Sequence, residues 1–211
     1  MTMNPDPDTE FAHAWVHGFE SAVLAHAGDL ADADRRAGDG DFGDNMRSAL
    51  RRARRTLDST TPTGAAEVMT QLAEGFLGTG GTSGPLFGMW FRAVAHGLRD
   101  ADAGTALAEG LRQGLASVQR LGGAEVGDKT MVDALAPAAD ALRDRAGVSV
   151  ADALARAAAA AEQGAASTRN LRAQRGRASY VGDHAVGVED PGARTVALFL
   201  RAGADAAGAL R

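Results

Sequence analysis

The chain reads DRRAGDGDFGDNM at residues 34–46, between two stretches that both have the pattern of a helix. Three carboxylates, Asp34, Asp39 and Asp41, lie within eight residues, with glycines among them. Carboxylates this close repel one another unless a cation or solvent compensates them, and glycine lets the backbone bend so that they converge. Mg²⁺ is usually held by one or two carboxylates together with substrate phosphates. The stretch therefore indicates either a divalent-metal loop or a solvated acidic turn.

The composition favours helix around this loop. The chain has 211 residues, of which 45% are hydrophobic and only 5% aromatic, and alanine makes up much of the apolar fraction. Such chains, poor also in β-branched residues, favour helix over strand. The length allows one domain with a sizeable core. Because there are no cysteines, disulfides, thiolate catalysis and zinc–thiolate sites are excluded.

The charge and the first residues bear on the setting in which the chain works. The net charge of −5 argues against a nucleic-acid partner. No stretch is long and apolar enough to predict a membrane span. The first ten residues are acidic and contain two prolines, which is unlike a signal peptide. We therefore expect a cytoplasmic protein without a membrane or nucleic-acid partner.

The apolar pattern predicts about eight helices separated by glycine breaks, and no strand. Phe11, Trp15, Phe19 and Val23 recur at spacings of four, which marks one face of a helix. Besides a short helix ending near Arg36, the expected helices cover 11–27, 44–57, 65–77, 86–98, 105–121, 131–146, 148–165 and 193–210. Residues 1–8 are expected to form a frayed tail and 168–192 to be irregular. Without a repeat or linker, we expect a single all-α domain over 1–211.

A second loop, GTGGTSGP at residues 78–85, has the composition of a phosphate-binding turn. Glycines allow close approach of the backbone, the hydroxyl groups add donors, and Pro85 is placed where a helix would begin. A helix N-terminus offers free N–H groups and partial positive charge to a phosphate. The loop is not a Walker motif, and the alternative is a flexible connection with an N-cap serine.

Two further loops carry candidate residues. GDKTMVDAL at 127–135 contains Lys129, the one lysine beside 21 arginines, which suggests that its compact charge is required, unless it has survived by chance. Asp128 and Thr130 could cap the next helix. GRASYVG at 176–182 contains Arg177, suited to phosphate, and DPGA at 190–193 could be an ordinary helix start. The five histidines form no metal spacing, and only His184 lies in a candidate loop.

In this order the four segments resemble the nucleotide-binding L subunit (DhaL family) of dihydroxyacetone kinase, over nearly the whole chain. The resemblance implies a barrel of eight antiparallel amphipathic helices with the nucleotide site at one end. It implies two Mg²⁺ ions held by Asp34, Asp39 and Asp41 and bridging the phosphates of ADP or ATP. It also implies nucleotide contacts from Asn45, Gly81, Thr82, Ser83, Gly123, Thr130, Met131, Arg177, Asp190 and Gly192.

The same resemblance implies partners. A separate K subunit would hold dihydroxyacetone or another ketose through a histidine, so that this chain is a kinase subunit of glycerol metabolism, inactive alone. The phosphoryl donor is either free ATP, or ADP kept as a coenzyme and recharged by a phosphotransferase-system protein. The subunit is expected to be a homodimer.

The chain departs from the family pattern at two positions. Position 42 is often histidine and is here Phe42, which removes a polar contact near the phosphates. Position 44 usually has a small hydroxyl residue and is here Asp44, which could join the metal, repel phosphate or cap the next helix; we expect the cap. The departures suggest a divergent paralogue. Two other classes also stay open: a nucleotide-binding co-regulator without catalysis, as some relatives of this family are, and a helical protein enclosing a lipid or metabolite, since a helix barrel can enclose an apolar cavity.

Overall fold

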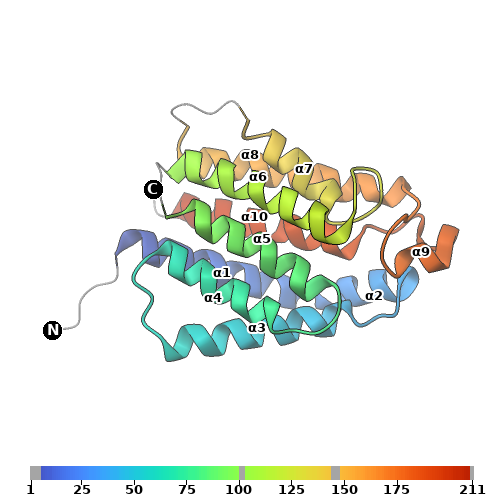
Figure 1. Ribbon diagram of the computed structural model, residues 1–211, viewed down its shortest axis with the longest axis horizontal. Helices are drawn as coiled ribbons and strands as arrows, with labels where there is room; N and C mark the ends of the chain where they lie inside the picture. Colours follow the sequence, from blue (N-terminus) through green and yellow to red (C-terminus); the bar gives the residue numbers. More distant parts are fainter. Residues whose placement is uncertain (1–5, 100–102, 144–147, 210–211) are drawn as a thin grey trace.

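The computed structural model describes residues 6–99, 103–143 and 148–209. Within these ranges it is helical and contains no strand, which confirms the all-α class (Figure 1). The α-helices are α1 Pro7–Ala25, α2 Ala27–Ala37, α3 Phe42–Ser59, α4 Ala65–Leu77, α5 Ser83–Gly97, α6 Ala103–Gly122, α7 Val132–Asp140, α8 Val150–Ser167, α9 Ala178–Val181 and α10 Pro191–Ala209. Two 3₁₀ turns, Thr168–Asn170 and Gly182–Ala185, flank α9. None of the described helices is both long and apolar enough to cross a membrane.

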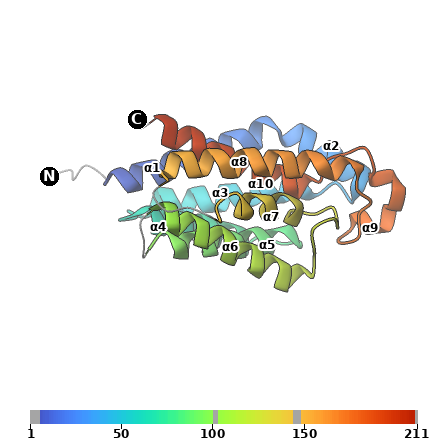
Figure 2. The same cartoon turned by 90° about the horizontal axis from the view of Figure 1, so that it is seen from above.

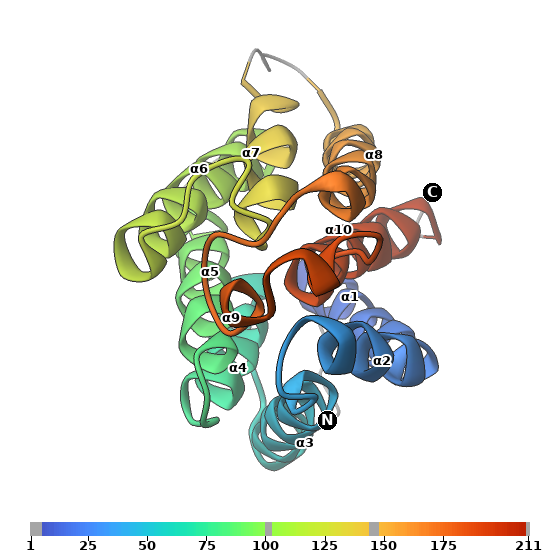
Figure 3. The same ribbon diagram turned by 90° about the vertical axis from the view of Figure 1, so that its right-hand side faces the viewer.

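The long helices lie side by side along one axis, as Figure 2 shows from above. Neighbouring helices contact one another in a closed cycle, α1–α10–α8–α7–α6–α5–α4–α1, with α3 packed on α4 and α2 on α3. Figure 3 looks along this axis and shows α9 at the near end. Successive long helices alternate in direction, so every second connection lies at that same end. These connections are 38–41, 78–82, 123–131 and 168–190, and they contain most of the motif residues.

Aromatic rings fill the space between the helices. Phe199 of α10 lies 5.2 Å from Phe19, 5.0 Å from Trp90 and 4.7 Å from Phe91, measured between ring centroids, and all four side chains are fully buried. Burying four large rings removes much apolar surface from water and stabilises the bundle. The filled centre disfavours the interpretation that these helices enclose a lipid or metabolite.

Some expected boundaries are wrong. The frayed tail does not reach residue 8, because α1 begins at Pro7, which is preorganised for a first helical turn and is followed by acidic residues there; residues 1–5 lie outside the described ranges. Helix α3 begins at Phe42 rather than at 44, and α5 at Ser83 rather than at 86. Helix α7 ends at Asp140, and the last residues of the expected helix, 144–146, are not described. The expected irregular segment 168–192 contains α9 and both 3₁₀ turns.

Candidate functional site

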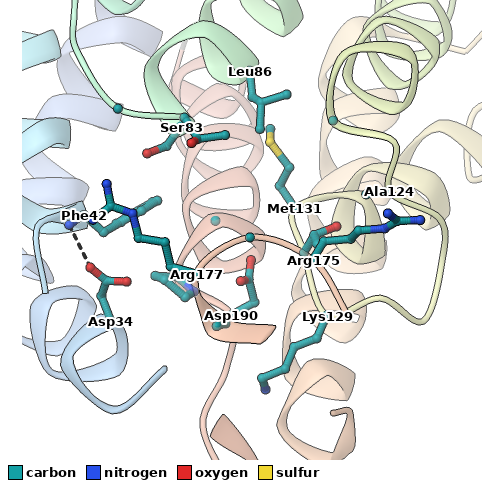
Figure 4. Close-up of a pocket in the computed structure, with 18 of the residues that line it drawn as sticks. Asp34, Phe42, Ser83, Leu86, Ala124, Lys129, Met131, Arg175, Arg177 and Asp190 are labelled. Atoms are coloured by element: carbon teal, nitrogen blue, oxygen red, sulfur yellow. Dashed lines mark hydrogen bonds between the residues drawn. The ribbon is translucent and has the colours of Figure 1, made fainter. Parts of the chain in front are cut away.

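The four connections surround a cavity of about 210 Å³ at one end of the bundle (Figure 4). The sequence had suggested functional roles for loops far apart in the chain, and the fold brings them to one place. The residues singled out from sequence that line the cavity are Asp34, Asp39, Asp41, Phe42, Gly81, Thr82, Ser83, Lys129, Thr130, Met131, Arg177, Asp190 and Gly192.

Two of the expected nucleotide contacts do not line the cavity. Gly123 lies between the lining residues Gly122 and Ala124 and has a φ of +62°, which glycine adopts readily. Asn45 lies behind the glycine loop, where its amide nitrogen would be 3.1 Å from a Cβ placed on Gly81. Both residues therefore shape the loops around the cavity, whereas their expected contacts to nucleotide remain predictions.

The acidic loop forms a cluster of oxygen donors. Carboxylate oxygens of Asp34, Asp39 and Asp41 lie within 4.8 Å of one another. Opposite ligands in an octahedral magnesium shell are about 4 Å apart, so small side-chain movements would close this cluster around a cation. Asp34 is oriented by the backbone N–H of Phe42, which donates to its Oδ2 at 2.9 Å. The donor set and spacing fit a divalent cation.

A guanidinium lies beside the same carboxylates. Arg177, in the loop before α9, contacts Asp39 and has its Nη1 3.8 Å from Oδ2 of Asp41. One positive group offsets only a third of the formal charge of three carboxylates. The cluster therefore keeps an excess of negative charge, which favours a bound cation.

Helix N-termini surround the rest of the cavity. Helix α5 begins at Ser83, α7 at Val132 and α10 at Pro191, and each of these residues lines the cavity. The first N–H groups of a helix have no partner within it, and the helix dipole places partial positive charge there. The first N–H groups of α7 and α10 are already bound by Thr130 and Asp190, whereas the start of α5 has no side-chain cap. The start of α5 beside the carboxylate cluster is therefore a polar site able to take an anion together with a cation.

Asp190 illustrates the electrostatics of the cavity floor. Burial raises the pKa of its carboxyl group to about 7, although the N–H of Ala193 and the charge of Lys129 act in the opposite direction. The Ala193 N–H donates to Oδ2 at 2.7 Å, as expected if Asp190 caps α10. The ordinary helix-start interpretation of DPGA is therefore supported, and Asp190 also lines the cavity.

Apart from Phe42, which the sequence had placed near the phosphates, sequence reasoning missed the apolar wall of the cavity. Phe42, Leu86, Phe87 and Val118 line it, and the ring of Phe42 packs edge-on against that of Phe87 with centroids 6.4 Å apart. Apolar residues on a helix carry no signal in the sequence that distinguishes an interior position from a cavity wall. Met131 continues the apolar surface toward α7 (Figure 4).

The expectation that Asp44 caps the following helix is wrong. Because α3 already begins at Phe42, Asp44 is its third residue, with its side chain 79% exposed. Its carboxylate pairs with Arg47 at 2.6 Å and is not part of the acidic cluster. Asp44 therefore contributes a surface ion pair and a favourable charge in the first helical turn.

The comparisons with known proteins agree with this geometry. The DAK2 domain family matches residues 36–205, and the chain belongs to this family. It is 32% identical to "PEP-dependent dihydroxyacetone kinase 1, ADP-binding subunit DhaL" of Listeria innocua, covering 92% of this chain and 95% of that subunit. It is 34% identical to "L-erythrulose 1-kinase" of Mycolicibacterium smegmatis, covering 90% of this chain but only 34% of that protein.

A solved structure supports the fold. The dihydroxyacetone kinase of C. freundii in complex with AMP-PNP and Mg²⁺ superposes with a TM-score of 0.67 at 28% identity, covering 96% of this chain and 35% of that one. The all-helical bundle is therefore the fold of a part of that kinase. The chain spans about a third of the kinase and of the erythrulose enzyme, and nearly the whole of the Listeria subunit.

Proposed function

We propose that this chain binds Mg²⁺ with ADP or ATP in the cavity and is the phosphoryl-transfer subunit of a kinase for dihydroxyacetone or a related ketose. The observation that carries the proposal is that the acidic cluster and the start of α5 line one cavity. The chain also aligns with 95% of the length of an ADP-binding subunit. The likeness to a kinase in complex with AMP-PNP and Mg²⁺ supports it.

The roles follow from the chemistry of each group. Asp34, Asp39 and Asp41 would hold two magnesium ions, which when bound neutralise charge on the phosphates. The N–H groups at the start of α5, with Ser83, would bind phosphate oxygens, and Arg177 would move from Asp39 to do the same. The apolar wall offers a surface for a nucleotide base. Phosphoryl transfer needs mainly positioning and charge neutralisation, so this chain requires no nucleophilic side chain.

The acceptor is proposed to arrive on a partner. The ketose would be held by a K subunit, and the phosphoryl donor would be either ATP or a phosphotransferase-system protein that recharges bound ADP. Calorimetry tests the binding step: ADP should bind tightly with Mg²⁺ and little in EDTA, and equal affinity would refute the metal site. Reconstitution with a K subunit tests the transfer step, since neither protein alone should phosphorylate dihydroxyacetone from MgATP.

A second candidate is a co-regulator that binds nucleotide but does not catalyse, and Phe42 favours it. Its buried ring faces Phe87 and offers no polar group where the family often has one. Nucleotide binding without ketose phosphorylation, with either phosphoryl donor and an active K subunit, would support this candidate. Replacing Phe42 by histidine would then be the first change to test for restored transfer.

A further inference from the structure

The single lysine of the chain has its charge buried beside the cavity. Lys129 is only 1% exposed and has a φ of +61°, which is uncommon outside glycine. Lys129 lines the cavity, and Figure 4 shows its side chain extending away from Ser83 and Leu86. Its Nζ donates to the carbonyl oxygens of Thr168 and Val188, each at 2.5 Å. The ammonium therefore binds backbone on two segments that are distant in sequence.

These two carbonyls stand at the two ends of one loop. Residues 169–187, which we call the arginine loop, leave the bundle after Thr168 and return just before Val188. The Gly187 N–H donates to the Arg169 carbonyl at 2.7 Å, so the two ends of the loop, which we call its neck, are joined to each other. The Asp190 N–H donates to Oγ1 of Thr168 at 2.8 Å, which adds a second link across the neck.

The arginine loop forms one wall of the cavity. Arg175, Gly176, Arg177 and Ala178 line it, and Arg177 reaches the acidic cluster. The loop has little core of its own, a small cluster of alanines at 173, 178 and 185. Its further links to the connection 123–131 go through Asp128, which pairs with Arg175 at 3.3 Å and accepts the Gln174 N–H at 3.0 Å. With so little burial, the position of the loop depends on polar links, including those at its two ends, and on the contact of α9 and the second 3₁₀ turn with α2.

We propose that Lys129 is a positioning residue whose ammonium clamps the two ends of the arginine loop, and so holds Arg177 over the acidic cluster. Hydrogen bonds from a charged donor are stronger than neutral ones, and a compact ammonium can direct separate N–H groups to two carbonyls. A planar guanidinium presents its donors in a fixed fork, which suits two separate carbonyls less well than a compact ammonium. This explains why a chain that otherwise uses arginine has a lysine here. Burial lowers the pKa of Lys129, and the charges of Asp190, Asp133 and Glu189 oppose that shift and favour the charged form.

Hydrogen exchange in the nucleotide-free protein tests the clamp. Lys129→Met keeps the apolar stem and removes the donors. Amides of residues 169–187, and that of Gly187 above all, should then exchange at least about tenfold faster, while those of α4 and α5 keep their rates. The control is Leu72→Ala, which opens a cavity at a fully buried position of α4 and should accelerate exchange across the helices without selecting the loop.

Either unchanged exchange in the loop or uniform acceleration in Lys129→Met would overturn the proposal. If that variant does not fold, Lys129→Gln, which retains a neutral donor, should show the same local pattern. Failure of both variants to fold would also refute a local clamp, since Lys129 would then be needed for the whole fold.

A second measurement concerns the site and rests on the proposed function. Lys129→Met should bind ADP with Mg²⁺ at least about tenfold more weakly, and Leu72→Ala within about threefold of the unaltered chain. If Lys129→Met retains full affinity, the clamp does not position Arg177. If the unaltered chain binds no ADP, the proposed function fails, whereas the exchange experiment still decides on the clamp.

Discussion

The carboxylate of Asp34 accepts the backbone N–H of Phe42 at 2.9 Å and so joins the end of α2 to the first residue of α3. An N–H at the start of a helix has no partner within that helix, and an aspartate from the preceding helix supplies one here. Because the donor belongs to the backbone, the bond does not depend on which side chain occupies position 42. The same bond orients one of the three clustered carboxylates, so helix capping and site geometry are coupled.

Asp34→Ala should therefore lower the free energy of unfolding by about 1 kcal/mol, the usual cost of losing a helix cap. Urea denaturation of the metal-free protein measures this change. Asp32→Ala is the matched control, because Asp32 lies on the same helix, is exposed and pairs with Arg35 at the surface. Equal losses in both variants would show that the Phe42 bond contributes nothing.

Asp39→Asn should weaken binding of ADP with Mg²⁺ by more than about tenfold, or 1.4 kcal/mol. The change removes a carboxylate from the cluster proposed to face the cation, and also the charge that pairs with Arg177. Folding should persist, because these side chains are in a surface-accessible loop. Calorimetry with Asp44→Asn provides the control: that carboxylate points to solvent and pairs with Arg47, so affinity should stay within about threefold. A comparable loss in both variants would mean that overall charge, and not ligation, governs binding.

The pH dependence of stability should reveal the raised pKa of Asp190. Its pKa is raised from 3.8 to about 7 by burial. Between these values the folded protein keeps a proton on Asp190 that the unfolded chain has released, so this group lowers the free energy of unfolding as pH rises from about 4 to 7. Asp190→Asn cannot ionise, and its stability relative to the unaltered chain should increase from pH 5 to pH 7.5. Denaturation series at both pH values would check this, with exposed Asp205→Asn as the control; the same increase in both variants would contradict it.

Gly164→Ala should destabilise the protein by about 1–3 kcal/mol through overpacking. A Cβ at this position in α8 would lie 2.2 Å from the Asp133 carbonyl oxygen of α7, so the two helices would have to separate. Asp133 also accepts the N–H groups of Gly127 and Thr130, so the loop beside the cavity should be disturbed. A Cβ added at Gly208 in α10 would meet no atom within 4 Å, so Gly208→Ala should be neutral or slightly stabilising. Thermal unfolding measures the melting temperature of both variants. Equal melting temperatures would contradict close packing of α7 on α8.

The helices could be predicted from the sequence because their signals are local. The spacing of Trp15, Phe19 and Val23 marks one buried face of α1, and all three side chains are buried in the structure. Boundaries were less certain where a helix extends into a motif. Pro85 was placed at the start of a helix, but it is the third residue of α5, a position in the first turn where a missing N–H costs nothing. Asp44 was misjudged for the same reason, since α3 begins two residues before it.

Candidate loops could also be recognised from residue types, because carboxylates and glycines at short spacing indicate metal and phosphate chemistry wherever they occur. Sequence could not show that Arg177 contacts Asp39, since these residues are separated by most of the chain. Nor could it show what the Lys129 ammonium hydrogen-bonds. Its rarity marked it as unusual, but its partners are backbone carbonyls, which carry no residue-specific signal.

The sequence by itself determined the helical class and the residue types of four connections, because propensity and motif chemistry depend on near neighbours in the chain. Only the tertiary structure decided that these connections meet. Successive long helices reverse direction, so alternate connections are brought to one end of the bundle, and aromatic packing between α1, α5 and α10 holds the helices in that arrangement. The cavity, the apolar wall facing its carboxylates and the buried charge of Lys129 all arise from that convergence, which no local stretch of sequence contains.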